Sequence, residues 1–267
     1  MAKALPRELT SYDILKTFAI VTMIIDHIGY YFFPDVAVFR AIGRLSLPVW
    51  LFLIGYANSR EVDARLLGGA LILIIANIVV GMHILPLNIL GTIIIVRLIR
   101  DVYAGFTFHS GETMLYSWLV LALLLIPAYI IMDHGTLAVG FAMIGYMMRR
   151  REEMPMSSGA RNAFMWAVAI AYFIVQMTIF GFNPFLATIF GVGLYLLMVV
   201  LRAFQRIKYS KRTAEWPQWR VEFFKLCGRR TLEIYVIHLL LFKAMALALG
   251  DERFGVLQFT LFGNFVV

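Results

Sequence analysis

Residues 12–33 read YDILKTFAIVTMIIDHIGYYFF, and this stretch decides the class of fold. A membrane-spanning helix needs about 20 mostly apolar residues, because each residue adds about 1.5 Å against about 30 Å of hydrocarbon. The stretch meets that length, is too long for the apolar core of a signal peptide, and is followed by no small-residue cleavage site, which predicts a retained first helix. Eight further apolar segments qualify as spans, at 36–57, 64–82, 84–99, 113–132, 135–149, 163–181, 184–203 and 231–249.

The composition also indicates a membrane protein. Of the 267 residues, 61% are apolar or aromatic and 15% are charged, whereas soluble domains average about 45–50% and about 25%. A globule of this size cannot hide so much apolar surface, which excludes a soluble domain, a disordered chain and a secreted disulfide scaffold. The single cysteine, Cys227, can form no intrachain disulfide. We expect an all-α integral membrane protein, one polytopic domain over residues 1–267, with about nine (8–10) transmembrane helices.

Two of the nine segments, 84–99 and 135–149, are short for a full span. Each is either tilted, irregular or buried by neighbouring helices instead of facing lipid. The segments show no convincing internal repeat, which weakens the prediction of an inverted-repeat transporter.

The net charge of +8 is a topology signal. Cytoplasmic loops of membrane proteins carry an excess of Lys and Arg. With the N-terminus in the cytoplasm, 20 of the 24 basic residues fall on the inner side, among them Lys3 and Arg7. Residues 204–230 then form a basic cytoplasmic loop lying against anionic lipid; they contain no nucleic-acid-binding motif, so we expect the bilayer and not nucleic acid as partner. The four basic residues outside this set are Arg40, Arg44, Lys243 and Arg253.

Ionisable residues inside the predicted spans are the candidate functional residues, because they are costly in lipid and normally face the bundle interior. Asp26 and His27 lie in the first span, where a carboxylate beside an imidazole can orient it. Adjacent helical residues point about 100° apart, so Asp26 can instead form an interhelical clamp with an arginine. Arg40 and Arg44 share one helical face at i, i+4 spacing. Arg44 either pairs with Asp26 or binds a phosphate or carboxylate, and Arg40 can snorkel outward.

The last span offers a second candidate group. His238 lies in its inner half and shares a face with Tyr235, while Lys243 lies farther along and can snorkel outward. His27 is predicted in the outer half of its own span, so the two histidines are expected at different depths. Asn88, in a short polar segment, is expected to line a cavity. The histidines follow no recognised metal-ligand spacing, and we expect no metal.

Several of these motifs resemble the TraX family of membrane proteins. The resemblance covers both ends and the middle of the chain, and its first two motifs are the most specific. The motifs are Leu15-Lys16 with residues 23–29 and 32–34, Arg40-Ala41-Ile42-Gly43-Arg44-Leu45-Ser46-Leu47-Pro48, residues 88–92, Asp133-His134-Gly135, and Tyr235-Val236-Ile237-His238.

The resemblance implies an acetyltransferase of the bacterial inner membrane that takes acetyl-CoA as donor, as the family's namesake does when it acetylates the N-terminal amine of pilin. In related transmembrane acyltransferases a membrane histidine is base or transient acyl carrier. By this resemblance His27 is the leading catalytic residue, Asp26 its supporting acid and His238 a second catalytic candidate. Arg44 is an anchoring cation, and the residues expected to bind the donor are Arg44, Arg40, Asn88 and Tyr235.

Three functions stay open at this point. An acetyltransferase needs a base for an amine or hydroxyl acceptor, which a neutral histidine supplies, and cationic groups for the CoA phosphates, which the basic inner loops supply. The acceptor is a pilin amine, a lipid or a glycan. A proton-coupled transporter would use the same polar residues to line a pathway, and a non-catalytic assembly protein would use them only for stability.

Overall fold

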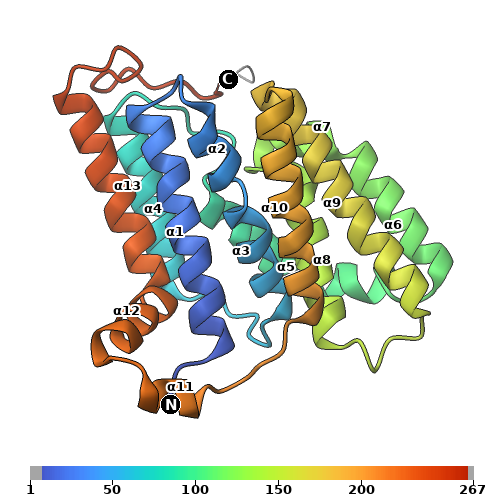
Figure 1. Cartoon of the computed structure of the whole chain (residues 1–267). Helices are drawn as coiled ribbons and strands as arrows, with labels where there is room; N and C mark the ends of the chain where they lie inside the picture. The colour runs from blue at the N-terminus through green and yellow to red at the C-terminus, as the bar shows by residue number, and fades with distance from the viewer. Residues whose placement is uncertain (1–7, 264–267) are drawn as a thin grey trace.

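A computed structural model describes residues 8–263, and every regular element among them is an α-helix (Figure 1). Lys3 and Arg7, counted above as cytoplasmic, lie outside the described residues. The helices are α1 (Ser11–Phe32), α2 (Ala37–Gly43), α3 (Ser46–Tyr56), α4 (Ala64–Val79), α5 (Ile89–Thr107), α6 (Gly111–Leu123), α7 (Leu125–Ile131), α8 (Gly135–Arg149), α9 (Ser158–Phe180), α10 (Pro184–Ala203), α11 (Ser210–Glu215), α12 (Gln218–Arg229) and α13 (Thr231–Ala248).

The prediction of an all-α, multi-pass membrane protein is confirmed at this coarser level. Within residues 8–263, five helices are long and apolar enough to cross a membrane, and the count is six if α6 and α7, which meet at a bend of 59°, form one span. About nine spans were expected. The five are Ser11–Phe32, Ala37–Tyr56, Ser158–Phe180, Pro184–Ala203 and Thr231–Ala248.

The remaining expected spans fall short for separate reasons. Helix α4 has 16 residues and α8 has 15, which is under the length of a full crossing. Helix α5 is longer but carries Arg97, Arg100 and Asp101 near its middle. Of the three alternatives for the short segment 135–149, the structure shows burial by neighbouring helices. Every residue of α8 except Tyr146 and Arg149 is buried.

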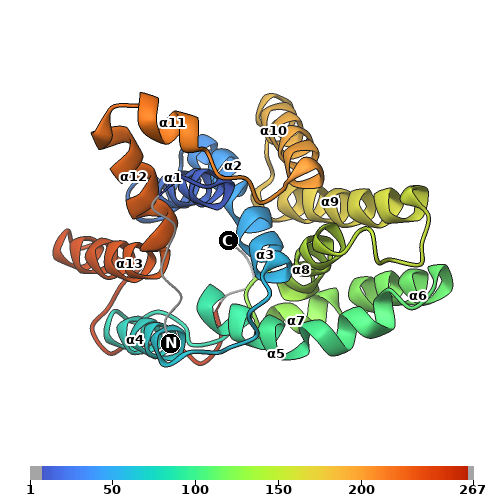
Figure 2. The same ribbon diagram turned by 90° about the horizontal axis from the view of Figure 1, so that it is seen from below.

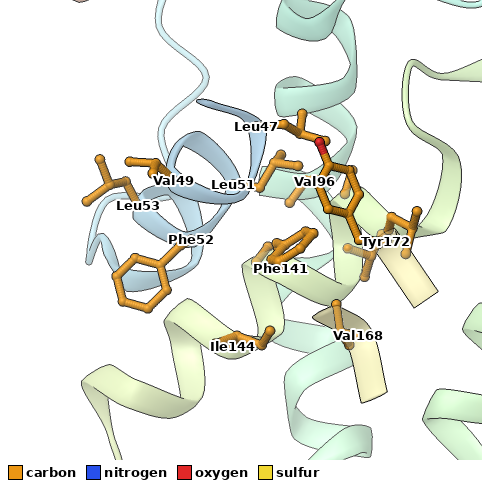
Figure 3. Packing of buried hydrophobic residues seen from close by; sticks show 14 of the residues in the cluster. Leu47, Val49, Leu51, Phe52, Leu53, Val96, Phe141, Ile144, Val168 and Tyr172 are labelled. Carbon is orange, nitrogen blue, oxygen red and sulfur yellow. The ribbon is translucent and has the colours of Figure 1, made fainter. Parts of the chain in front are cut away.

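The contact between α3 and α8 forms the centre of the bundle. Seen from below, both helices lie inside the other helices (Figure 2). Phe141 of α8 faces Leu51 of α3 and Tyr172 of α9, with ring centroids of Phe141 and Tyr172 5.2 Å apart (Figure 3). The close approach depends on glycine, because a Cβ on Gly55 or on Gly145 would lie under 2 Å from a carbonyl oxygen of the other helix.

We expect Gly145→Ala to destabilise the protein, because the added methyl group would stand 1.9 Å from the backbone oxygen of Phe52. Overpacking of this kind costs about 1–3 kcal/mol. Thermal unfolding in detergent measures it, and Gly105→Ala is the matched control because nothing lies within 4 Å of a Cβ there. An unfolding midpoint of Gly145→Ala at or above that of Gly105→Ala would show that α3 and α8 leave room for a methyl group at Gly145.

The segment 204–230 is largely helical rather than an open loop. Helix α11 and helix α12 lie within it, and α12 packs along the start of α1. A Cβ on Gly228 would lie 2.6 Å from the Cα of Asp13, and Arg229 Nε lies 3.4 Å from the Asp13 carboxylate. The last helix, α13, therefore does not begin level with the first residue of α1. It begins beside a point several residues into α1.

The second predicted span, 36–57, is broken between α2 and α3 at Arg44 and Leu45. Pro48 follows in the first turn of α3, where proline is tolerated because no intrahelical acceptor faces its missing N–H. The Tyr172 hydroxyl donates to the Arg44 carbonyl oxygen at 2.7 Å and holds the break in place. This break places the start of α3 inside the bundle.

Candidate active site

The two intramembrane histidines are in contact. His27 Nδ1 lies 2.7 Å from His238 Nε2, and the two rings stack with centroids 5.0 Å apart. The expectation that they lie at different depths was wrong. Because α12 packs along α1 before α13 begins, His238 is raised to the level of His27 although it lies only eight residues into its helix.

The hydrogen bonds of His238 determine which nitrogen of His27 carries a proton. His238 Nδ1 lies 2.7 Å from the carbonyl oxygen of Ile234, which can only accept, so Nδ1 carries the hydrogen. In neutral His238, Nε2 then accepts, and His27 Nδ1 donates to it. Neutral His27 is left with an unprotonated Nε2, which is the form that a general base requires.

Asp26 pairs with two arginines, Arg40 of α2 and Arg44 directly after that helix. Its carboxylate accepts from Arg40 Nη1 at 2.8 Å and from Arg44 Nη2 at 2.8 Å and Nε at 3.2 Å. Among the described residues no hydrogen bond joins Asp26 to His27. Asp26 was expected to support His27 as its acid, but no hydrogen bond between the two described side chains carries that role. The alternative role, an interhelical clamp with an arginine, matches the geometry. Gly43 permits it, since a Cβ there would lie 2.2 Å from the Asp26 Cβ.

A cavity of about 340 Å³, here called the entry cavity, lies between α1, α3, α4, α5 and α13. Basic side chains from four helices line it at the end of the bundle where α1 begins. Two acids, Asp63 and Glu233, lie among them, and Glu233 pairs with Arg65. The basic lining residues are Lys16, Arg65, Arg97 and Arg229.

A smaller cavity of about 90 Å³, here called the inner cavity, adjoins the entry cavity. Both cavities are lined by Met23, Trp50, Ile89 and Tyr235, so these four side chains form the partition between them. His27 lines the inner cavity, while His238 lines neither and is 8% exposed. The other residues lining the inner cavity are Asp26, Gly43, Arg44, Ser46, Leu47, Asp133 and His134.

The four residues expected to bind the donor lie in different places. Tyr235 lines both cavities and Arg44 lines the inner one, whereas Arg40 and Asn88 line neither. Asn88 caps α5, because its Oδ1 accepts from Leu90 N and its Nδ2 donates to the Ala70 carbonyl oxygen of α4. The Asn88 side chain is thus used by the fold.

Eight residues that line the inner cavity were not among the expected site residues, and four of them carry a polar group in the side chain: Ser46, Trp50, Asp133 and His134. Pro48 was a usable signal for Ser46, because a proline inside an apolar segment marks a helix start and a break before it. Gly135, at φ 53, follows His134 at φ 66, and this left-handed turn directs Asp133 and His134 inward. Trp50 carries no such signal, because tryptophan is an ordinary residue of membrane helices.

At the opposite end of the bundle, Lys243 is buried and does not snorkel. Its Nζ donates to Asn77 Oδ1 at 2.6 Å, and it is 4% exposed. Beyond it, Arg253 donates to the carbonyl oxygens of Tyr30 and Tyr31 at the end of α1. Arg253 also hydrogen-bonds Asp251 and holds the pKa of that carboxyl below its usual range. The segment after α13 thereby closes over the end of α1.

The model of one family, described as TraX protein, matches residues 11–246. An uncharacterized protein of Rickettsia prowazekii (strain Madrid E) is 30% identical over 147 residues, which are 52% of this chain and 56% of that protein. The chain thus spans little more than half the length of this relative. No solved structure matches the chain.

Proposed function

The chain belongs to the TraX family, and from its site we propose that it is an integral membrane acetyltransferase. It moves an acetyl group from cytosolic acetyl-CoA to an amine or hydroxyl acceptor on a protein, lipid or glycan, with His27 as base. One observation carries the proposal: His27, oriented by His238 at 2.7 Å, lines a small polar cavity that adjoins a larger cavity with a basic end. We also propose the bacterial inner membrane as its location, on the basis of its TraX family membership and of its helices that are long and apolar enough to cross a membrane.

The entry cavity suits the donor. Acetyl-CoA has an anionic nucleotide end and a long, thin pantetheine arm, and Lys16, Arg97 and Arg229 line the cavity where the nucleotide would enter. The arm would extend between apolar side chains such as Leu53 and Ile93 toward Trp50. The inner cavity, with about a quarter of the volume of the entry cavity, favours a short acyl group.

The proposed reaction is a single acyl transfer. The acceptor nitrogen or oxygen attacks the thioester carbonyl carbon while His27 Nε2 takes its proton. Collapse of the tetrahedral intermediate breaks the carbon–sulfur bond, and the imidazolium returns the proton to the leaving sulfur, which gives CoA as the thiol. His238 accepts the His27 Nδ1 hydrogen throughout and stabilises the charged ring.

The topology that fits this chemistry has the N-terminus in the cytoplasm. The basic end of the entry cavity then faces the compartment that holds acetyl-CoA, in agreement with the positive-inside bias. Helices α4, α5 and α8 complete nine passes in this proposal, shielded from lipid by their neighbours where they are short or charged.

We expect Lys16→Gln to raise the KM for acetyl-CoA about tenfold, the effect of about 1.4 kcal/mol lost from one phosphate contact. Lys16 lines the entry cavity and makes no hydrogen bond or ion pair with another described residue. The assay uses radiolabelled acetyl-CoA, protein in lipid nanodiscs and a membrane extract of the producing cells as acceptor. Arg202→Gln, a basic residue that is exposed and lines neither cavity, is the matched control.

The same preparations separate the proposal from transport. Label transfer to the extract by the wild-type protein supports an acetyltransferase. Equal KM values for Lys16→Gln and Arg202→Gln would remove the entry cavity as the donor site. Substrate flux into proteoliposomes without acyl-CoA, together with no label transfer, would establish a transporter and overturn the proposal.

A further inference from the structure

Helix α3 begins inside the bundle beside the inner cavity. Its first two residues, Ser46 and Leu47, line this cavity together with His27. Ser46 is 8% and Leu47 5% exposed, so this end of α3 is largely removed from bulk water. Buried polar groups without a hydrogen-bond partner are rare, so such groups beside the cavity point to a ligand.

Two side chains of α3 supply unpaired donors next to this cavity. The Ser46 hydroxyl has no hydrogen-bond partner among the described residues. Trp50, one helical turn farther on the same face, has a buried indole N–H without an acceptor and also lines the cavity.

The neighbouring charges leave these donors available. Arg44, which directly precedes the break, is engaged by Asp26 through two hydrogen bonds. Its guanidinium therefore adds positive potential to the inner cavity while its hydrogen bonds are used elsewhere. Donors without acceptors in a cavity that holds the proposed base are the arrangement expected for binding a developing oxygen anion.

We propose that the start of α3 holds the oxyanion-binding site of the reaction, with the Ser46 hydroxyl and the Trp50 indole N–H as donors. The proposal rests on the acetyl transfer proposed above. As the acceptor attacks, the carbonyl π electrons move onto the thioester oxygen, and this oxygen accepts hydrogen bonds from α3. The electrons return to form the carbonyl when the carbon–sulfur bond breaks, so Ser46 gains no covalent bond.

Ser46→Ala removes one donor and leaves the Trp50 indole N–H in place. We expect kcat to fall about 10²-fold, the lower end for loss of one oxyanion donor, with the KM for acetyl-CoA unchanged. S-ethyl-CoA, a thioether that lacks the thioester carbonyl oxygen, is expected to bind the wild type and Ser46→Ala with equal Kd. Ser46→Cys, nearly isosteric but with a weak donor, is expected to lose at least about tenfold in kcat.

The outcomes separate this proposal from the function it rests on. Wild-type turnover with unchanged kcat in Ser46→Ala and Ser46→Cys would overturn the oxyanion site and leave the acetyltransferase intact. An acetyl group found on the Ser46 peptide after rapid quenching would also overturn it, since Ser46 would then be a nucleophile. Absence of turnover and of S-ethyl-CoA binding in the wild type would instead refute the proposed function. Thermal unfolding of each variant identifies loss of fold, in which case Ser46→Cys decides.

Discussion

His27→Gln is expected to lower acetyl transfer by about 10²–10⁴-fold, the usual contribution of a positioned general base. Glutamine has a similar length, and its amide N–H can still donate to His238 Nε2, so the packing of the pair is kept. It cannot take a proton from the acceptor. The loss should appear in kcat, with binding of S-ethyl-CoA unchanged, because His27 lines the inner cavity rather than the basic end of the entry cavity.

The controls distinguish a base from a structural histidine. His238→Phe frees His27 from its hydrogen bond, so His27 adopts either tautomer and kcat falls less than in His27→Gln. His109→Gln, in the exposed connection between α5 and α6, should leave turnover unchanged. Full turnover by His27→Gln in well-folded protein would contradict the assignment of the base.

Asp26→Asn is expected to destabilise the protein by about 3–5 kcal/mol, because it leaves two buried arginines without their counter-charge. Both guanidinium groups and the carboxylate are largely removed from solvent, with side-chain exposures of 13% and 9%. The thermal unfolding midpoint in detergent and the yield of monodisperse protein measure the effect. Asp35→Asn is the control, because Asp35 is exposed and pairs with no described residue.

The same variant decides between two roles for Asp26. As a clamp, Asp26 affects stability, and the folded fraction of Asp26→Asn keeps turnover within about tenfold of the wild type. As the acid that supports His27, it would affect kcat at unchanged stability. An unfolding midpoint equal to that of Asp35→Asn would contradict the clamp.

Much of the fold could be predicted from hydrophobic run length, because the bilayer imposes a minimum on every crossing helix. This rule located helices at all nine segments. It could not predict that α8 is enclosed by other helices, since enclosure depends on the glycine contacts of Gly55 and Gly145 with a partner far away in the sequence. Nor could it predict the level along α1 at which α13 begins, because this level is set by the packing of α12 on Asp13.

The candidate site could be predicted in part, because ionisable groups are rare in apolar spans. That argument selected His27, His238, Asp26 and Arg44, and the structure brings them together in two contacts. It could not decide which residue pairs with which, because neighbours on a helix point about 100° apart. Ser46 was missed because serine is common in membrane helices, and its importance follows from a helix break inside the bundle.

We propose that the protein transfers an acetyl group from acetyl-CoA to a membrane-associated acceptor, with His27 as the general base. The most direct test feeds isotope-labelled acetyl groups to cells that produce the wild type, His27→Gln or His109→Gln at equal levels, and compares their membrane proteins and lipids by mass spectrometry. We expect a labelled acetyl product in wild-type and His109→Gln cells that is lost in His27→Gln cells. The same labelled products in all three would contradict the role of His27.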